Sequence, residues 1–309
     1  MLNLSQQFLS VLVLVAASTT VRAFAAPNDS QLVRMVPAGA EIVSGIADPG
    51  TPGATGRILV ATESNNRDFN DCLALLGIDG DKTIEEVVES ASSSVAGDVS
   101  NHLLLLRGRF DHARIFKAAI ENRATRRDYN GLSLLVIPPF QRERQQINQV
   151  RWLAILNDRI LVFGVPGTVA NALDRYAHNE QTDPILARRL AQFRTDVNCW
   201  SVIAMPFPML ESHLALYLLS ESWKATLRDV DELAVGIHYG YYDRVDFTVH
   251  VDGSDGSVGR LMAEGQLIRA SVTSAREFQV ESLPTNENRL RGSFKVRATE
   301  FDRWLASVE

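Results

Sequence analysis

Histidine and aspartate side chains recur at alternating positions in two adjacent segments that read as strands. The set consists of His238, Asp246, His250 and Asp252. In extended chains these side chains share one face, and a turn around Tyr241 and Tyr242 would place His238 nearly opposite Asp246. Imidazoles and carboxylates on one face can bind zinc or another divalent metal, or form a His–Asp acid/base pair. The alternative is the solvated face of an antiparallel sheet, where such alternation is ordinary.

Other motifs that carry chemistry are incomplete. Residues 252–256 (DGSDG) suggest a calcium loop, but the EF-hand spacing and its final Glu are absent, which favours a turn and a helix cap. No G-x-S-x-G is present, and Ser133 lies in YNGLSLLVI, a turn followed by a strand. The two cysteines, Cys72 and Cys199, are interpreted as buried thiols, with a single disulfide as the alternative. We expect no cofactor.

The charge is unevenly distributed along a chain whose formal net charge is −6. Residues 107–159 hold eleven basic and five acidic residues, a net +6, and residues 229–264 hold two basic and eight acidic residues, a net −6. These regions can be two partner surfaces, or they can attract each other within the fold or in a dimer. Candidate anion-binding residues in the basic region are Arg123, Arg126, Arg127, Arg142 and Arg144. Solvated loops and helix ends are the alternative. The overall charge and the lack of interleaved aromatic residues argue against nucleic acid as a partner.

The first residues resemble an export signal. An apolar run, FLSVLVLVAA, precedes Ala23-Phe24-Ala25, which fits the small-x-small cleavage rule. We therefore predict a signal peptide over residues 1–25 and a periplasmic or secreted mature chain. No later apolar run is long enough to cross a membrane, so no transmembrane segment is expected after cleavage. The alternative is a tethering or buried N-terminal helix.

The remaining chain shows weak internal similarity. Residues 102–120 and 246–268 each contain an extended run, a Gly/Asp turn and a helix-period segment, and an acidic-apolar strand precedes each. We therefore predict an α+β fold of two similar strand-helix-hairpin-helix units with mainly antiparallel sheets and helices on one face. The predicted organisation is a linker at 26–39, a first repeat at 40–178, a connecting segment at 179–198 and a second repeat at 199–309. Chance similarity between amphipathic segments is the alternative, and the sequence leaves open whether the two sheets merge.

The stretch LLLLRGRFDHARI marks a change from strand to helix. Leu103 to Leu106 are apolar at every position, which is typical of a strand buried on both faces. Asp111 precedes a helical pattern, where its carboxylate can accept hydrogen bonds from free backbone N–H groups. Gly108 belongs to no phosphate-binding motif. Asn157-Asp158, between two apolar runs, predicts a tight hairpin.

Several segments resemble an uncharacterised group of exported bacterial proteins of the acidobacterial type. The segments are AGAEIVSGIAD, LLGIDGDKTIEEV, LLLLRGRFD, YNGLSLLVI and LNDRILVFG. The resemblance implies export and a duplicated α+β fold, and it carries over no catalytic residue. The leading hypothesis is a non-enzymatic binding or adaptor protein of the cell envelope, with an envelope protein or an apolar or anionic ligand as partner. The alternatives are a metal-dependent enzyme using the His/Asp face and a structural envelope component.

Overall fold

The computed structural model describes the chain in several stretches. These are residues 30–47, 73–74, 76–78, 84–93, 99–142, 145–147, 149–193, 197, 199–204, 230–238, 242–251, 276–282 and 289–297. The predicted signal peptide, Cys72, Arg144, Asp252 and the 252–256 turn lie outside these residues. None of the helices in the described stretches combines the length and apolar character needed to cross a membrane.

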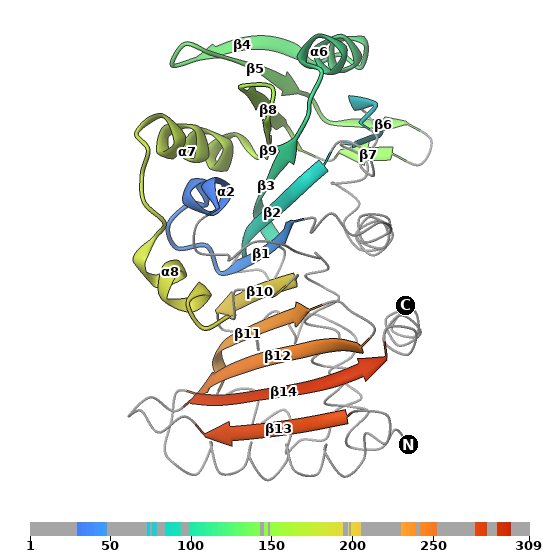
Figure 1. Ribbon diagram of the computed structural model, residues 1–309. Helices are drawn as coiled ribbons and strands as arrows, with labels where there is room; N and C mark the ends of the chain where they lie inside the picture. The colour runs from blue at the N-terminus through green and yellow to red at the C-terminus, as the bar shows by residue number, and fades with distance from the viewer. Residues whose placement is uncertain are drawn as a thin grey trace.

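A single sheet of twelve strands forms the centre of the fold, and every pairing in it is antiparallel (Figure 1). The strands are β1 (Ile42–Ala47), β2 (Ile84–Ser93), β3 (Val99–Gly108), β4 (Thr125–Tyr129), β5 (Leu132–Ile137), β8 (Arg151–Leu156), β9 (Ile160–Gly164), β10 (Cys199–Ala204), β11 (Val230–His238), β12 (Tyr242–Val251), β13 (Arg276–Ser282) and β14 (Arg289–Arg297). Their order is β13-β14-β12-β11-β10-β1-β2-β3-β9-β8-β5-β4. Strands β6 (Phe140–Arg142) and β7 (Gln145–Ile147) pair separately. The fold is therefore mixed α and β with a large antiparallel sheet, as the sequence predicts.

The pairing of β1 with β10 joins the amino-terminal and carboxy-terminal parts into this one sheet. Ser44 lies opposite Ser201, and their hydroxyl oxygens are 2.9 Å apart. On the other face of the sheet, the indole of Trp200 lies over Gly45, the residue directly opposite it. Trp200 is 2% exposed, so a large buried ring packs where β1 and β10 meet. The question left open by the sequence is thereby answered, because both halves share one continuous sheet.

Four helices are described: α2 (Gln31–Met35), α6 (His112–Glu121), α7 (Pro166–Ala177) and α8 (Pro184–Leu190). Because directly opposed residues of antiparallel strands point to the same face, the strand registers show that α2, α7 and α8 contact one face. Ser30, at the start of α2, bonds Glu86, Asp174 of α7 bonds Tyr129, and Arg189 of α8 bonds Glu232. Figure 1 shows these three helices on the same side of the sheet.

Helix α2 lies inside the segment 26–39 that the sequence analysis interprets as a linker. The structure differs because Leu32, Val33 and Met35 are buried in the core. Ser30 caps the helix, its hydroxyl accepting a hydrogen bond from the Leu32 amide at 3.2 Å. These apolar side chains and the cap make residues 30–35 part of the folded unit.

The predicted junction between strand and helix is confirmed. Leu103 to Leu106 are all buried in the middle of the sheet. Asp111 caps α6, with its carboxylate accepting a hydrogen bond from the Arg114 amide at 3.0 Å. The predicted hairpin is also confirmed, because Asn157 and Asp158 join β8 to β9 with φ values of 53° each. Positive φ at both central residues is the geometry of a type I′ turn.

Helix α7 is held to two hairpin turns by polar side chains. The hydroxyl of Tyr129 and the amide of Asn130, at the β4–β5 turn, donate to the Asp174 carboxylate at 2.9 and 3.2 Å. Asn157, at the β8–β9 turn, donates to the hydroxyl of Tyr176 at 2.7 Å. The hydrogen bond to Asp174 raises the pKa of Tyr129, because it stabilises the protonated phenol.

Candidate functional site

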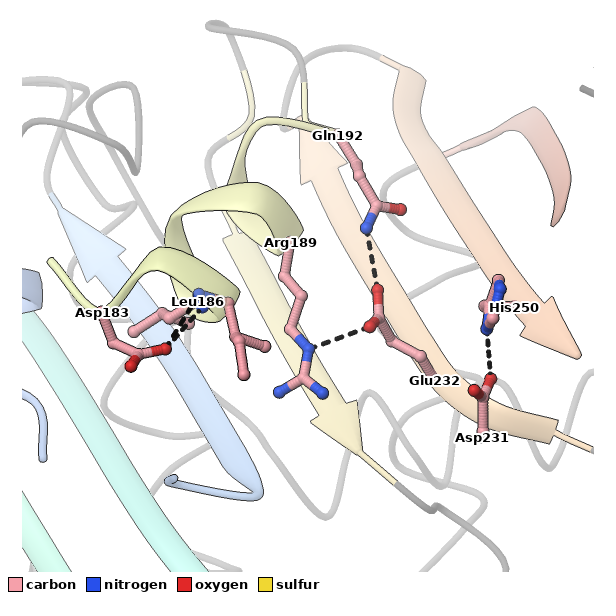
Figure 2. A network of polar contacts seen from close by, with 8 residues as sticks. Asp183, Leu186, Arg189, Gln192, Asp231, Glu232 and His250 are labelled. Atoms are coloured by element: carbon pink, nitrogen blue, oxygen red, sulfur yellow. Dashed lines mark hydrogen bonds and ion pairs between the residues drawn. The ribbon is translucent and has the colours of Figure 1, made fainter. Parts of the chain in front are cut away.

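A network of polar contacts surrounds Glu232 on β11 (Figure 2). Its carboxylate accepts hydrogen bonds from Arg189 Nε at 2.9 Å and Gln192 Nε2 at 2.8 Å. Helix α8 positions Arg189, and Asp183 caps this helix by accepting from the Ile185 and Leu186 amides. Glu232 is 5% exposed, so its charge is removed from water and compensated by the arginine.

A histidine and an aspartate lie beside this network. His250 Nδ1 on β12 is 2.6 Å from Asp231 Oδ1, and both side chains are partly exposed. His250 is directly opposite Glu232 in the strand register, and the register shifts between Val230 and Glu232. This β-bulge makes Asp231 an extra residue with no residue directly opposite it on β12, so its side chain can reach the His250 imidazole. A His–Asp pair of this geometry can transfer protons or bind a polar ligand.

The predicted His/Asp face differs from this arrangement in its register. His238 lies opposite Arg244, and Asp246 lies opposite Gly236, two residues from the predicted pairing. His238 is therefore not directly opposite Asp246, although both residues belong to the same face as His250. Within the described stretches, no group of three or more His, Cys, Asp and Glu side chains has the geometry to hold a metal ion. Asp231, which no pattern in the sequence indicates, is the carboxylate beside His250.

A similar carboxylate lies on β2. Glu86 is buried and accepts a hydrogen bond from the Ser30 hydroxyl, and its Oε2 is 2.9 Å from Nη1 of Arg107. Burial raises the pKa of Glu86, while the Ser30 hydrogen bond and the Arg107 charge oppose that shift. As at Glu232, the carboxylate connects the sheet to the helix layer, in this case at the start of α2.

We expect Glu86→Gln to flatten the dependence of stability on pH. Because the pKa of Glu86 is higher in the folded state than its ordinary value of 4.5, its contribution to stability is present below that value and is lost as the pH rises through the folded pKa. Urea unfolding between pH 4 and 8 should show the variant gaining stability relative to the wild type as the pH rises. Glu85→Gln is the matched control, since Glu85 makes an exposed ion pair with Arg159. Parallel wild-type and Glu86→Gln curves would contradict the expectation.

Three of the predicted anion-binding arginines, Arg123, Arg126 and Arg127, have described side chains. Arg126 and Arg127 are neighbours on β4 and therefore project to opposite faces. Arg126 Nε donates to Ser133 Oγ at 2.7 Å, and the Arg127 guanidinium lies over the Trp152 ring, 5.3 Å from its centroid. Arg123 follows α6 with a φ of 69° and is exposed. Arg142 lies on β6, which pairs with β7 in a separate two-stranded sheet that does not include β4.

The basic and acidic regions lie in different parts of the sheet. Strand β4 is at one edge, and β11 is eight strands away in the order. At about 4.8 Å between neighbouring strands, this is about 38 Å along the sheet. Exposed charges are screened over about 8 Å at physiological ionic strength. The exposed arginines of β4 therefore do not neutralise the acidic residues of β11 within the molecule (Figure 1).

Comparisons with known proteins show a fold and no family. No protein-family model matches the sequence, and no curated protein matches it. A solved structure, crystal form I of TP0453, is similar over 90% of this chain and 98% of its own, with a TM-score of 0.51 and 10% sequence identity. At that identity the likeness concerns the fold alone.

Proposed function

We propose that this chain is an exported, non-enzymatic binding or adaptor protein of the bacterial cell envelope, of the group that its sequence resembles. The main support is how its charged side chains are used. Glu86 and Glu232 are occupied in holding helices to the sheet. In contrast, the side chains of Arg123 and Arg127 form no hydrogen bond or ion pair with the described residues, and both are exposed. The exposed guanidinium groups of Arg123 and Arg127 are therefore available to bind a partner.

We also propose that the sheet consists of two equivalent units related by a pseudo-twofold axis at Ser44 and Ser201. Reading outward from the joint, β1-β2-β3-β9-β8 corresponds to β10-β11-β12-β14-β13. The opening strands read IVSGIA and CWSVIA, with Ser, Ile and Ala at matching positions. The next strands both carry a bulge, between Ile84 and Glu86 and between Val230 and Glu232. This correspondence makes Glu86 and Glu232 equivalent and supports two repeats that carry helices on one face.

Native mass spectrometry with elemental analysis of the mature chain, purified from an exported preparation, tests the proposed function. We expect a mass that corresponds to cleavage near Ala25, no stoichiometric metal, and a retained ligand or partner. A stoichiometric metal or an uncleaved amino terminus would contradict the proposal. A stable, ligand-free homo-oligomer would favour a structural envelope component instead.

The Asp231–His250 contact favours one alternative, proton transfer or metal binding at the His/Asp face. Set against it, the neighbouring Glu232 carboxylate is already bound by Arg189 and Gln192. A His238→Ala/His250→Ala variant separates the two functions. A binding protein should keep its fold and its partner in this variant, whereas a metal enzyme should lose bound metal.

A further inference from the structure

We propose that the outer edge of β4 binds an acidic, extended segment of a partner protein, which adds to the sheet as a further strand. The proposal rests on the adaptor function and specifies its partner. Among the described strands, β4 is the last in the sheet order and pairs with β5 alone. Such an edge presents backbone N–H and C=O groups that an extended peptide can bind.

Most side chains of β4 are exposed to solvent. Thr125, Arg126, Arg127 and Asp128 are all exposed, whereas Tyr129 at the end of the strand is only half-buried. The exposed stretch of four residues is long enough for a short antiparallel or parallel pairing.

Two arginines define the chemistry of the edge. They point to opposite faces, so an added strand would meet one guanidinium on each face. Arg126 contacts Ser133 of β5 and Arg127 contacts the Trp152 ring of β8, so both side chains stay above and below the sheet at this edge. Carboxylates at adjacent positions of the incoming strand would each lie beside one arginine, and opposite charges at such positions stabilise a strand pair.

The same charges disfavour other occupants. A second copy of β4 in the fully overlapping antiparallel register would place Arg127 opposite Arg127, and directly opposed like charges are destabilising. The one acidic residue of the strand, Asp128, accepts a hydrogen bond from the Gly131 amide at 3.2 Å, which directs its carboxylate toward the hairpin turn. The edge therefore resists self-association and selects an acidic strand.

Binding of a labelled peptide to the full chain at low salt, followed by fluorescence anisotropy, tests the proposal. The probe is TIEEVVES, an acidic strand taken from residues 83–90 of this sequence. Two control peptides accompany it: TIQQVVQS, which lacks the charges, and TIEEVVES with alternate backbone amides methylated. We expect the neutral peptide and the methylated peptide each to bind at least tenfold more weakly than the probe. Vesicles containing phosphatidylglycerol are not expected to bind.

Variants locate the site. Arg126→Glu/Arg127→Glu should reduce affinity for the probe at least tenfold, and the milder Arg126→Gln/Arg127→Gln should do so with less risk to folding. Arg109→Glu/Lys117→Glu is the charge-matched control, because those side chains are 84% and 78% exposed and lie outside β4. Equal binding of the methylated peptide would overturn strand addition, as would absence of peptide binding or preference for the vesicles. If any of these results were obtained but native mass spectra still showed a bound partner, the strand-addition proposal would be wrong and the adaptor function would still be supported.

Discussion

Replacing Arg189 with Met should lower the free energy of unfolding by about 3–5 kcal/mol, because it leaves the buried Glu232 carboxylate without its cation. The side chains of Arg189 and Glu232 are 16% and 7% exposed, so water cannot replace the lost ion pair. Gln192 would still donate one hydrogen bond, which is insufficient to compensate a buried charge. Equilibrium urea unfolding of the variant at neutral pH measures the loss.

A second substitution should restore most of that stability. In Arg189→Met/Glu232→Gln the charge is gone, and the new amide oxygen can still accept from Gln192. We therefore expect the double variant to be more stable than Arg189→Met alone. Lys117→Met is the control, because Lys117 belongs to an exposed pair with Glu121 and should change stability by less than about 1 kcal/mol. Additive losses in the double variant would show that the ion pair does not contribute as described.

Replacing Trp200 with Ala should cost about 3–5 kcal/mol, the usual range for truncating a large buried aromatic residue. Trp200 lies at the joint between the two halves of the sheet, 2% exposed and in contact with Phe193 at 6.3 Å between ring centroids. Its removal would leave a cavity over the backbone of Gly45, which has no side chain to fill it. Thermal and urea unfolding, monitored by far-UV circular dichroism, measure the effect.

Gly45, the residue opposite Trp200, provides a test of the packing between these two residues. A Cβ atom at Gly45 would clash with the indole ring of Trp200, so Gly45→Val alone should be strongly destabilising. In a Trp200→Val background, the same substitution should cost much less, because the added methyl groups enter the space that the indole vacates. Equal cost of Gly45→Val in both backgrounds would contradict the close packing of this glycine and tryptophan.

Strands and local turns follow from the sequence because short-range signals specify them. The runs TIEEVVES, RWLAIL and WSVIAM correspond to β2, β8 and β10, and Asn157-Asp158 forms the predicted turn. Each depends on neighbouring residues: apolar content, β-branched side chains, and residues that tolerate positive φ. Helix α2 was missed because its five residues are too few for a periodic pattern, and its stability comes from packing.

The side-chain contacts of the candidate site could not be predicted from such short-range signals. The register of β11 against β12 depends on where the chain turns, and an error of two residues exchanged Asp246 for Arg244 opposite His238. The contact between Asp231 and His250 depends on a bulge, which alternation between faces does not reveal. The ion pair of Arg189 with Glu232 joins residues 43 positions apart, and no local rule pairs them. The sequence did contain one usable signal: two adjacent acidic residues occur early in each strand, Glu85-Glu86 in β2 and Asp231-Glu232 in β11.

The pairing of β1 with β10 also sets the order in which the chain can fold. Ser201, the partner of Ser44 on β10, lies 157 positions further along the chain, whereas Glu89, its partner on β2, lies 89 − 44 = 45 positions further. During synthesis, the first half can assemble while β1 is still an open, apolar edge. Such edges pair readily with other chains, and contacts over long sequence separations form slowly. A chaperone or rapid delivery of β10 would therefore protect this protein during the interval in which its first half is folded and its central strand still lacks a neighbour.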